Sequence, residues 1–128
     1  MENYKNLFTQ YCQAFNAQDT DRIAELYVFP FELVSEGKRY EFATREVFLD
    51  NLYKRLGIYR DMGVNSILFR LVEEETDNKS AMIHWTMLNA ENRIIIDFNT
   101  RYHFAKGQLR INCVEVYDEP EKLRKLLA

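Results

Sequence analysis

The sequence predicts an α+β fold in which three N-terminal helices pack on a strongly curved antiparallel sheet. Three observations predict it. Apolar residues near the N-terminus recur with a helical period, the chain from residue 64 onward is rich in β-branched and aromatic residues, and only three or four polar residues separate its later segments. Connections this short join antiparallel strands, since a parallel crossover needs about a dozen residues or more. The length of 128 residues fits a single domain over 1–128.

Two helices are expected to open the chain. One apolar stripe at helical spacing runs through Tyr4, Leu7, Phe8, Tyr11, Cys12 and Phe15. After a polar break, Asp19 is a good N-cap for a second, short helix that carries Ile23, Leu26 and Tyr27. Pro30 then ends helical continuation, so extended chain is expected to begin there.

Residues 31–42 predict a β-hairpin with the turn at Glu36-Gly37. That turn places Phe31 opposite Phe42, with the apolar side chains of both strands on one face. Two glutamates meet on the other face, which we therefore expect to be exposed to solvent.

A third helix is expected to begin after Thr44, which is a plausible N-cap. Its apolar period continues to Tyr59, so the helix ends at Gly57 or at Gly63, and we favour the later end. Beyond it the period changes to that of strands. Four strands are predicted, at 64–75, 79–88, 93–104 and 108–117, and the tail after Pro120 is expected to form a short helix.

Composition excludes several classes of function. The formal charge of −3 offers no basic surface for nucleic acid and no polybasic membrane anchor. The longest apolar runs are only a few residues, and the first residues lack the apolar stretch of a signal peptide. Cys12 and Cys113 have no metal-binding or redox spacing. We expect a cytoplasmic protein with reduced thiols, no metal and no cofactor.

The segment from Tyr11 to Tyr27 resembles the opening of ketosteroid isomerases and their nuclear transport factor 2-like relatives, which also include SnoaL-like proteins and polyketide cyclases. The shared features are an aromatic helix, an Asn-Ala-x-Asp-x-Asp step and a helix ending in Leu-Tyr. Residues 104–109 resemble the last hairpin of that family, and Thr44-Arg-Glu resembles the start of its third helix. The resemblance implies a cystatin-like cone that encloses a pocket, with an outer sheet face that often forms a dimer.

The resemblance also relates three positions to the catalytic groups of the isomerases. Tyr11 matches their oxyanion-binding tyrosine. Ser35 stands where they have a general-base aspartate, and Thr100 stands where they have a protonated aspartate. Two of the three roles therefore lack a carboxyl group, which argues against steroid isomerisation. No catalytic residue is identified.

Aligning the strand at 93–104 with the family turns Thr100 and Tyr102 inward. The same reasoning turns Asn112 inward on the last strand, at 108–117. The expected ligand-binding residues are Tyr11, Phe15, Trp85, Phe98, Thr100, Tyr102 and Asn112. For Tyr11 and Tyr102, simple core packing is an alternative, because a buried tyrosine usually finds a partner. An apolar aromatic pocket with a few polar groups suits a small apolar or aromatic molecule.

The opposite face of the sheet is expected to form a homodimer. It would carry Met82, His84, Leu88, Asp97, Asn99, Arg101 and His103, with His84 opposite Asp97. A shift of one residue in the pairing of the strands at 79–88 and 93–104 would turn His84 into the pocket in place of Trp85. The function indicated is small-molecule binding. The alternatives are an isomerase, dehydratase or polyketide cyclase that uses other acid–base groups such as Tyr11 and Tyr102, and a protein-association module.

Overall fold

The computed structural model describes residues 4–74, 80–105 and 109–117. Two helices and a β-hairpin come first, a third helix follows, and four strands complete the described chain. The expected tail helix after Pro120 lies outside the described residues. The helices are α1 (Tyr4–Asn16), α2 (Thr20–Ala24) and α3 (Arg45–Asp61). The strands are β1 (Tyr27–Ser35), β2 (Lys38–Phe42), β3 (Ser66–Glu74), β4 (Ser80–Leu88), β5 (Ile94–Phe104) and β6 (Ile111–Tyr117).

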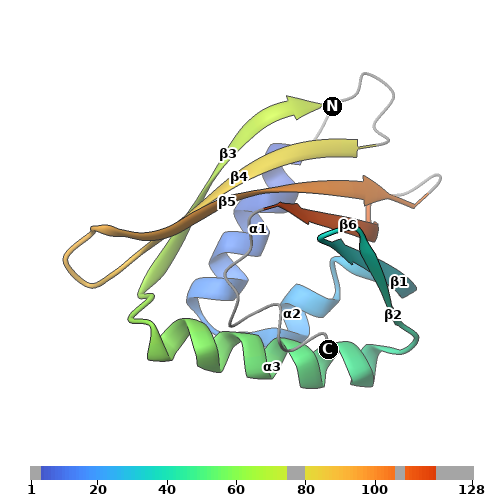
Figure 1. The fold of residues 1–128 in the computed structure, drawn as a ribbon, viewed down its shortest axis with the longest axis horizontal. Coiled ribbons are helices and arrows are strands. Elements are labelled where there is room, and N and C mark those ends of the chain that lie inside the picture. Colours follow the sequence, from blue (N-terminus) through green and yellow to red (C-terminus); the bar gives the residue numbers. More distant parts are fainter. Residues whose placement is uncertain (1–3, 75–79, 106–108, 118–128) are drawn as a thin grey trace.

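The six strands form one curved sheet in the order β2-β1-β6-β5-β4-β3. The helices gather on one side of this sheet, with α3 crossing below the strands (Figure 1). The sheet is not wholly antiparallel as predicted, because β1 and β6 pair in parallel. Short connections force antiparallel pairing only between consecutive strands, and β1 and β6 are separated by most of the chain.

The β1–β2 hairpin has the predicted register, with Phe31 opposite Phe42. Glu36 and Gly37 have φ angles of +53° and +77°, the left-handed pair that a two-residue hairpin turn requires. On the exposed face, Arg39 donates to a carboxylate oxygen of Glu32 at 2.7 Å. This ion pair offsets the repulsion expected there between facing glutamates.

Helix α3 has the predicted bounds. The Thr44 hydroxyl accepts a hydrogen bond from the Val47 backbone N–H at 3.3 Å, as an N-cap does. The helix continues through Gly57, and Gly63, with φ at +93°, follows its C-cap. The later of the two predicted ends is therefore confirmed.

Helix α2 is shorter than predicted. Asp19 caps it, accepting from the Arg22 backbone N–H at 3.2 Å, but the helix ends at Ala24. The backbone N–H of Ile111 donates to the Leu26 carbonyl at 2.8 Å, so this segment is already bound to β6. Tyr27 consequently belongs to β1, and its ring faces the interior.

The inner faces of β4 and β5 are those predicted. On β4 the alternate residues from Ala81 to Met87, including Trp85, are buried, and on β5 so are those from Ile96 to Phe104. Alternation along each strand therefore lines the concave face with apolar side chains and leaves the polar ones outside.

Candidate functional site

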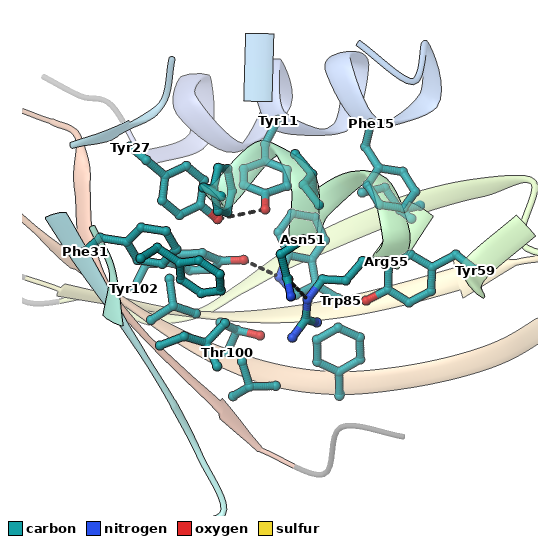
Figure 2. Close-up of a pocket in the computed structure, with 18 of the residues that line it drawn as sticks. Tyr11, Phe15, Tyr27, Phe31, Asn51, Arg55, Tyr59, Trp85, Thr100 and Tyr102 are labelled. Carbon is teal, nitrogen blue, oxygen red and sulfur yellow. Dashed lines mark hydrogen bonds between the residues drawn. The ribbon is translucent and has the colours of Figure 1, made fainter. Parts of the chain in front are cut away.

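A cavity lies between the concave face of the sheet and helices α1 and α3 (Figure 2). Its volume is about 90 Å³, enough for several water molecules or a small organic molecule. Aromatic rings make up most of the wall: Tyr11, Phe15, Tyr27, Phe31, Phe42, Phe48, Tyr59, Trp85, Phe98 and Tyr102. Aliphatic side chains add Leu33, Leu52, Ile67, Met87, Val114 and Val116.

Four of the aromatic residues in this wall form hydrogen bonds with one another in pairs. The hydroxyl groups of Tyr11 on α1 and Tyr27 on β1 are 2.9 Å apart and share a hydrogen bond (Figure 2). The indole N–H of Trp85 donates to the Tyr102 hydroxyl oxygen, also at 2.9 Å. The rings of Tyr11 and Trp85 are in contact, with centroids 5.2 Å apart. We call Tyr11, Tyr27, Trp85 and Tyr102 the aromatic polar cluster.

The tyrosines of the aromatic polar cluster are held in their neutral form. Burial raises the pKa of Tyr11, while its hydrogen bonds with Tyr27 and Tyr102 and the nearby Arg55 cation lower it in part. Burial raises the pKa of Tyr27 and of Tyr102 well above that of a free tyrosine, and the neighbouring Tyr11 adds to both shifts. At neutral pH these groups therefore act as hydrogen-bond donors and acceptors rather than as bases.

Helix α3 adds a charged group to the wall. Asn51 and Arg55 are one helical turn apart and both line the cavity. The Asn51 side-chain oxygen accepts a hydrogen bond from Arg55 Nε at 3.0 Å (Figure 2). Arg55 is half-buried and is the only charged residue among the described residues that line the cavity.

The sheet contributes one further polar group, the hydroxyl of Thr100 on β5. Thr100 is only 2% exposed and lines the cavity. Within the described part of the chain, its Oγ1 has no hydrogen-bond partner. A buried hydroxyl without a partner costs about 1–3 kcal/mol, so this atom favours a bound water or ligand.

Six of the seven predicted ligand-binding residues line the cavity, and one does not. The six are Tyr11, Phe15, Trp85, Phe98, Thr100 and Tyr102. Asn112 is the exception, because the β5–β6 register shifts between His103–Cys113 and Phe104–Ile111. At this bulge Ile111 is fully buried and Asn112 is only half-buried.

Two further polar residues considered from the sequence also lie off the cavity wall. Ser35 is buried at the end of β1 but is not among the residues that line the cavity. His84 does point outward, as predicted, but the residue directly opposite it is Asn99 rather than Asp97. The Nδ1 atom of His84 lies 2.8 Å from the Asn99 side-chain oxygen, and its Nε2 lies 3.6 Å from a carboxylate oxygen of Asp97.

Sequence reasoning missed Tyr27, Asn51, Arg55 and Tyr59 as residues of the cavity wall. Asn51, Arg55 and Tyr59 recur every four residues and form one row along α3. The apolar end of this row, at Tyr59, is a signal that the two polar members also face inward. Tyr27 was missed because it was assigned to a helix.

The described residues contain no group of three or more His, Cys, Asp or Glu side chains that could hold a metal ion. None of the helices in the described ranges is long and apolar enough to cross a membrane.

The sequence matches no known family model and no curated protein. The fold, by contrast, resembles many solved structures. One is a nuclear transport factor 2-like protein of unknown function from Shewanella oneidensis, with a TM-score of 0.64, 19% identity, and coverage of 90% of this chain and 96% of that one.

Two further structures have related descriptions. A SnoaL-like protein of unknown function from Burkholderia thailandensis has a TM-score of 0.61 and 20% identity, covering 88% of this chain and 92% of its own. A putative polyketide cyclase from Sinorhizobium meliloti has a TM-score of 0.56 and 16% identity, covering 88% and 94%. The curved sheet, the helices that cover it and the similar solved structures all indicate the same architecture. The chain has the nuclear transport factor 2-like fold.

Proposed function

We propose that this protein binds a small, largely apolar or aromatic molecule in the cavity between the sheet and helices α1 and α3. The observation that carries the proposal is an aromatic wall that remains open around a buried, unpartnered hydroxyl, that of Thr100, within the described residues. Apolar cavities with a few convergent polar groups are typical binding sites for small molecules. A ligand that bonds to Thr100 would recover the free energy that its isolated burial costs.

The chemistry of the wall favours binding over catalysis. The described lining residues include no aspartate, glutamate or histidine, which are the usual general bases near neutral pH. The tyrosines of the aromatic polar cluster have raised pKa values, so they polarise a carbonyl or hydroxyl group by hydrogen bonding without removing a proton. An isomerase, dehydratase or polyketide cyclase reaction needs such a base, whereas binding does not.

The open cavity also favours small-molecule binding over a role in protein association alone. A module that serves only to associate has no need of unfilled volume, because tight packing of the interior is more stable. Both cysteines are free thiols, and we propose on this basis that the protein works in the reducing cytoplasm.

We further propose that the protein is a homodimer through the outer face of the sheet. Met82, His84 and Asn99 are half-buried on this face, and Leu68 on β3 is 56% exposed beside them. His103 and Glu115 form a hydrogen bond across β5 and β6 on the same side. Apolar residues interspersed with satisfied polar pairs form a surface that can be self-complementary about a two-fold axis.

Native mass spectrometry of freshly purified protein tests the binding function. We expect a fraction of the protein to carry an added mass in the small-molecule range, which a solvent extract then identifies. Calorimetry with single-ring aromatic compounds provides the second measurement. A protein that purifies without added mass and binds no member of a set of neutral and anionic aromatic compounds would contradict the proposal.

A further inference from the structure

We propose that the ligand is an uncharged aromatic compound with a carbonyl or hydroxyl oxygen, and that Thr100 on β5 donates a hydrogen bond to this oxygen. The inference rests on the proposed binding function and names the chemical class of the ligand. The polar end of the molecule then faces the sheet at Thr100, and its ring lies among the aromatic side chains of the wall.

The first support is the place of Thr100 in the sheet. It lies opposite Ile83 on β4 and opposite Val116 on β6, and both of these neighbours are buried and apolar. Phe98 and Tyr102 flank it on the same face of β5, and neither forms a hydrogen bond with its hydroxyl. The hydroxyl is buried and has no partner within the described residues, and Figure 2 shows it directed towards the cavity. Its partner therefore has to come from the cavity.

The second support is that the other polar side chains of the described wall have partners within the protein. They form the pairs Tyr11–Tyr27, Trp85–Tyr102 and Asn51–Arg55, and Tyr59 has an interaction of its own. Among the described lining residues, one hydroxyl is thus left for the ligand. A molecule with one polar group and an otherwise apolar body satisfies such a wall.

The third support is the charge of the wall. Arg55 is the only charged side chain among the described lining residues, and it is already engaged within the protein, in part by its hydrogen bond with Asn51 at 3.0 Å. An ion that leaves water for surroundings this apolar loses its hydration, and only a counter-charge dedicated to it offsets that loss. A neutral ligand avoids this cost.

The direction of the hydrogen bond follows from the balance of donors and acceptors. The aromatic polar cluster holds one N–H and three O–H donors but only three acceptor oxygens. Its tyrosines keep their protons, because burial raises their pKa values. No carboxylate lines the cavity among the described residues. A ligand that brings an acceptor oxygen therefore complements the wall better than one that brings a further donor.

The test compares Thr100→Val with the wild-type protein by calorimetry on the full chain. Valine has nearly the shape of threonine and lacks the hydroxyl. Two probes of similar size are titrated: benzaldehyde, which has an acceptor oxygen, and toluene, which has no hydrogen-bonding group. We expect the substitution to weaken benzaldehyde binding about two- to tenfold, the range of a neutral hydrogen bond, and to leave toluene bound equally or more tightly.

Thr86→Val is the matched control. It removes the same hydroxyl from the outer face of β4, away from the cavity, and both affinities should stay as in the wild type. Thr100→Ser keeps the hydroxyl and should retain the wild-type ratio of benzaldehyde to toluene affinity.

Two further probes examine the direction of the bond and the charge of the ligand. Phenol both donates and accepts, so Thr100→Val should weaken it by about the same factor as benzaldehyde; a loss confined to phenol would show that Thr100 accepts, and would overturn the acceptor assignment. Benzoate has a similar shape and a negative charge. The wild-type protein should bind it more weakly than benzaldehyde, and the reverse order would overturn the assignment of a neutral ligand.

Stability provides a readout that needs no ligand. Because Thr100→Val removes a buried hydroxyl that has no partner within the described residues, the variant should unfold at the same urea concentration as the wild type or at a higher one. A variant that is clearly less stable, or that does not fold, would show that the hydroxyl is bonded within the protein and would overturn the inference.

The outcomes separate the two proposals. If Thr100→Val changes benzaldehyde and toluene affinity by the same factor, the role of Thr100 is wrong and the binding function stands. If the wild-type protein binds none of the four probes nor any other single-ring compound, both proposals are wrong.

Discussion

The indole N–H of Trp85 donates a hydrogen bond to the hydroxyl oxygen of Tyr102, although the two residues do not face each other in the sheet. Trp85 on β4 lies opposite Phe98, and Tyr102 is four residues further along β5. Because the Tyr102 oxygen accepts from the indole, its own proton is directed elsewhere, towards Tyr11 or a ligand. A tryptophan that has no acceptor role thus sets the direction of hydrogen bonding in the aromatic polar cluster.

Truncation of Trp85 is the first prediction. The side chain is 3% exposed and packs against Phe8, Tyr11 and Phe69. We expect Trp85→Ala to lower the free energy of unfolding by about 3–5 kcal/mol in urea denaturation. Trp85→Phe, which retains an aromatic ring, should stay folded, and its free energy of unfolding should fall by less than that of Trp85→Ala. An alanine variant as stable as the wild type would show that Trp85 is not part of the core.

Alkaline pH should destabilise the protein through its buried tyrosines. Their folded-state pKa values are raised above the unfolded value of about 10, so their contribution to stability is complete below pH 10. Above that pH the unfolded state loses protons that the folded state retains, and the free energy of unfolding falls. The slope reaches about 1.4 kcal/mol per pH unit for each such tyrosine until its folded-state pKa is passed.

Urea denaturation from about pH 8 to about pH 11 measures this slope. Tyr27→Phe should make it shallower, because one of the three raised groups is gone. Tyr53→Phe is the control, since Tyr53 is 70% exposed on α3 and should leave the slope as it is. Identical slopes in the two variants would contradict the assignment to the buried cluster.

Steroid double-bond isomerisation is not expected of this protein. The resemblance places Ser35 at the general-base position, and its hydroxyl is too weak a base at neutral pH; a positioned base contributes about 10²–10⁴-fold. Ser35 also lies off the cavity wall. Loss of the second carboxyl group, at Thr100, removes roughly a further 10²–10³-fold. A spectrophotometric assay on a β,γ-unsaturated ketosteroid should show no enzymatic turnover.

Two variants extend this assay. Thr100→Asp places a carboxyl group on the cavity wall, and Ser35→Asp places one outside it, so we expect little gain from the second substitution. Robust turnover by the wild type would show that the alignment with the isomerases is misplaced.

The proposed dimer predicts a defined response to charge on the outer face. The wild type should sediment as a dimer at concentrations on the order of tens of micromolar. Met82→Lys, near the start of β4, should shift it to monomer, because the lysine would be buried unpaired at the interface. Val47→Lys on α3, 51% exposed and away from this face, should remain dimeric. A wild-type protein that is monomeric throughout would refute the proposal.

The sequence predicted the faces of the sheet better than its registers. His84 was placed opposite Asp97 and in fact faces Asn99, a slip of two residues. Side chains alternate with a period of two, so a slip of two leaves every residue on its predicted face. Asn112 was misplaced because a bulge shifts β6 by one residue, so the alternation that holds from Val114 onward does not extend back to Asn112.

The charged part of the cavity could not be predicted with the same ease. On a helix, Asn51 and Arg55 have the spacing of a solvent-exposed polar pair, and their neighbours Tyr53 and Lys54 are indeed exposed. Tyr59 in the same row indicates the inward direction, but it is the packing of α3 against the concave sheet that turns the polar members of the row towards the cavity. The aromatic residues that β4 and β5 add to the wall, Trp85, Phe98 and Tyr102, by contrast follow directly from strand alternation and could be predicted from the sequence.

The parallel pairing of β1 with β6 has a consequence for the order of events during synthesis. Leu33 on β1 lies beside Val114 on β6, about 80 residues later in the chain, whereas β3, β4 and β5 pair with near neighbours. On the ribosome the three-stranded meander can therefore assemble first, while the β1–β2 hairpin waits for a strand that emerges after all the others. The cavity is therefore complete only after this last step. Until β6 is available, Phe31 and Leu33 on β1 cannot join the part of the wall that β4 and β5 supply.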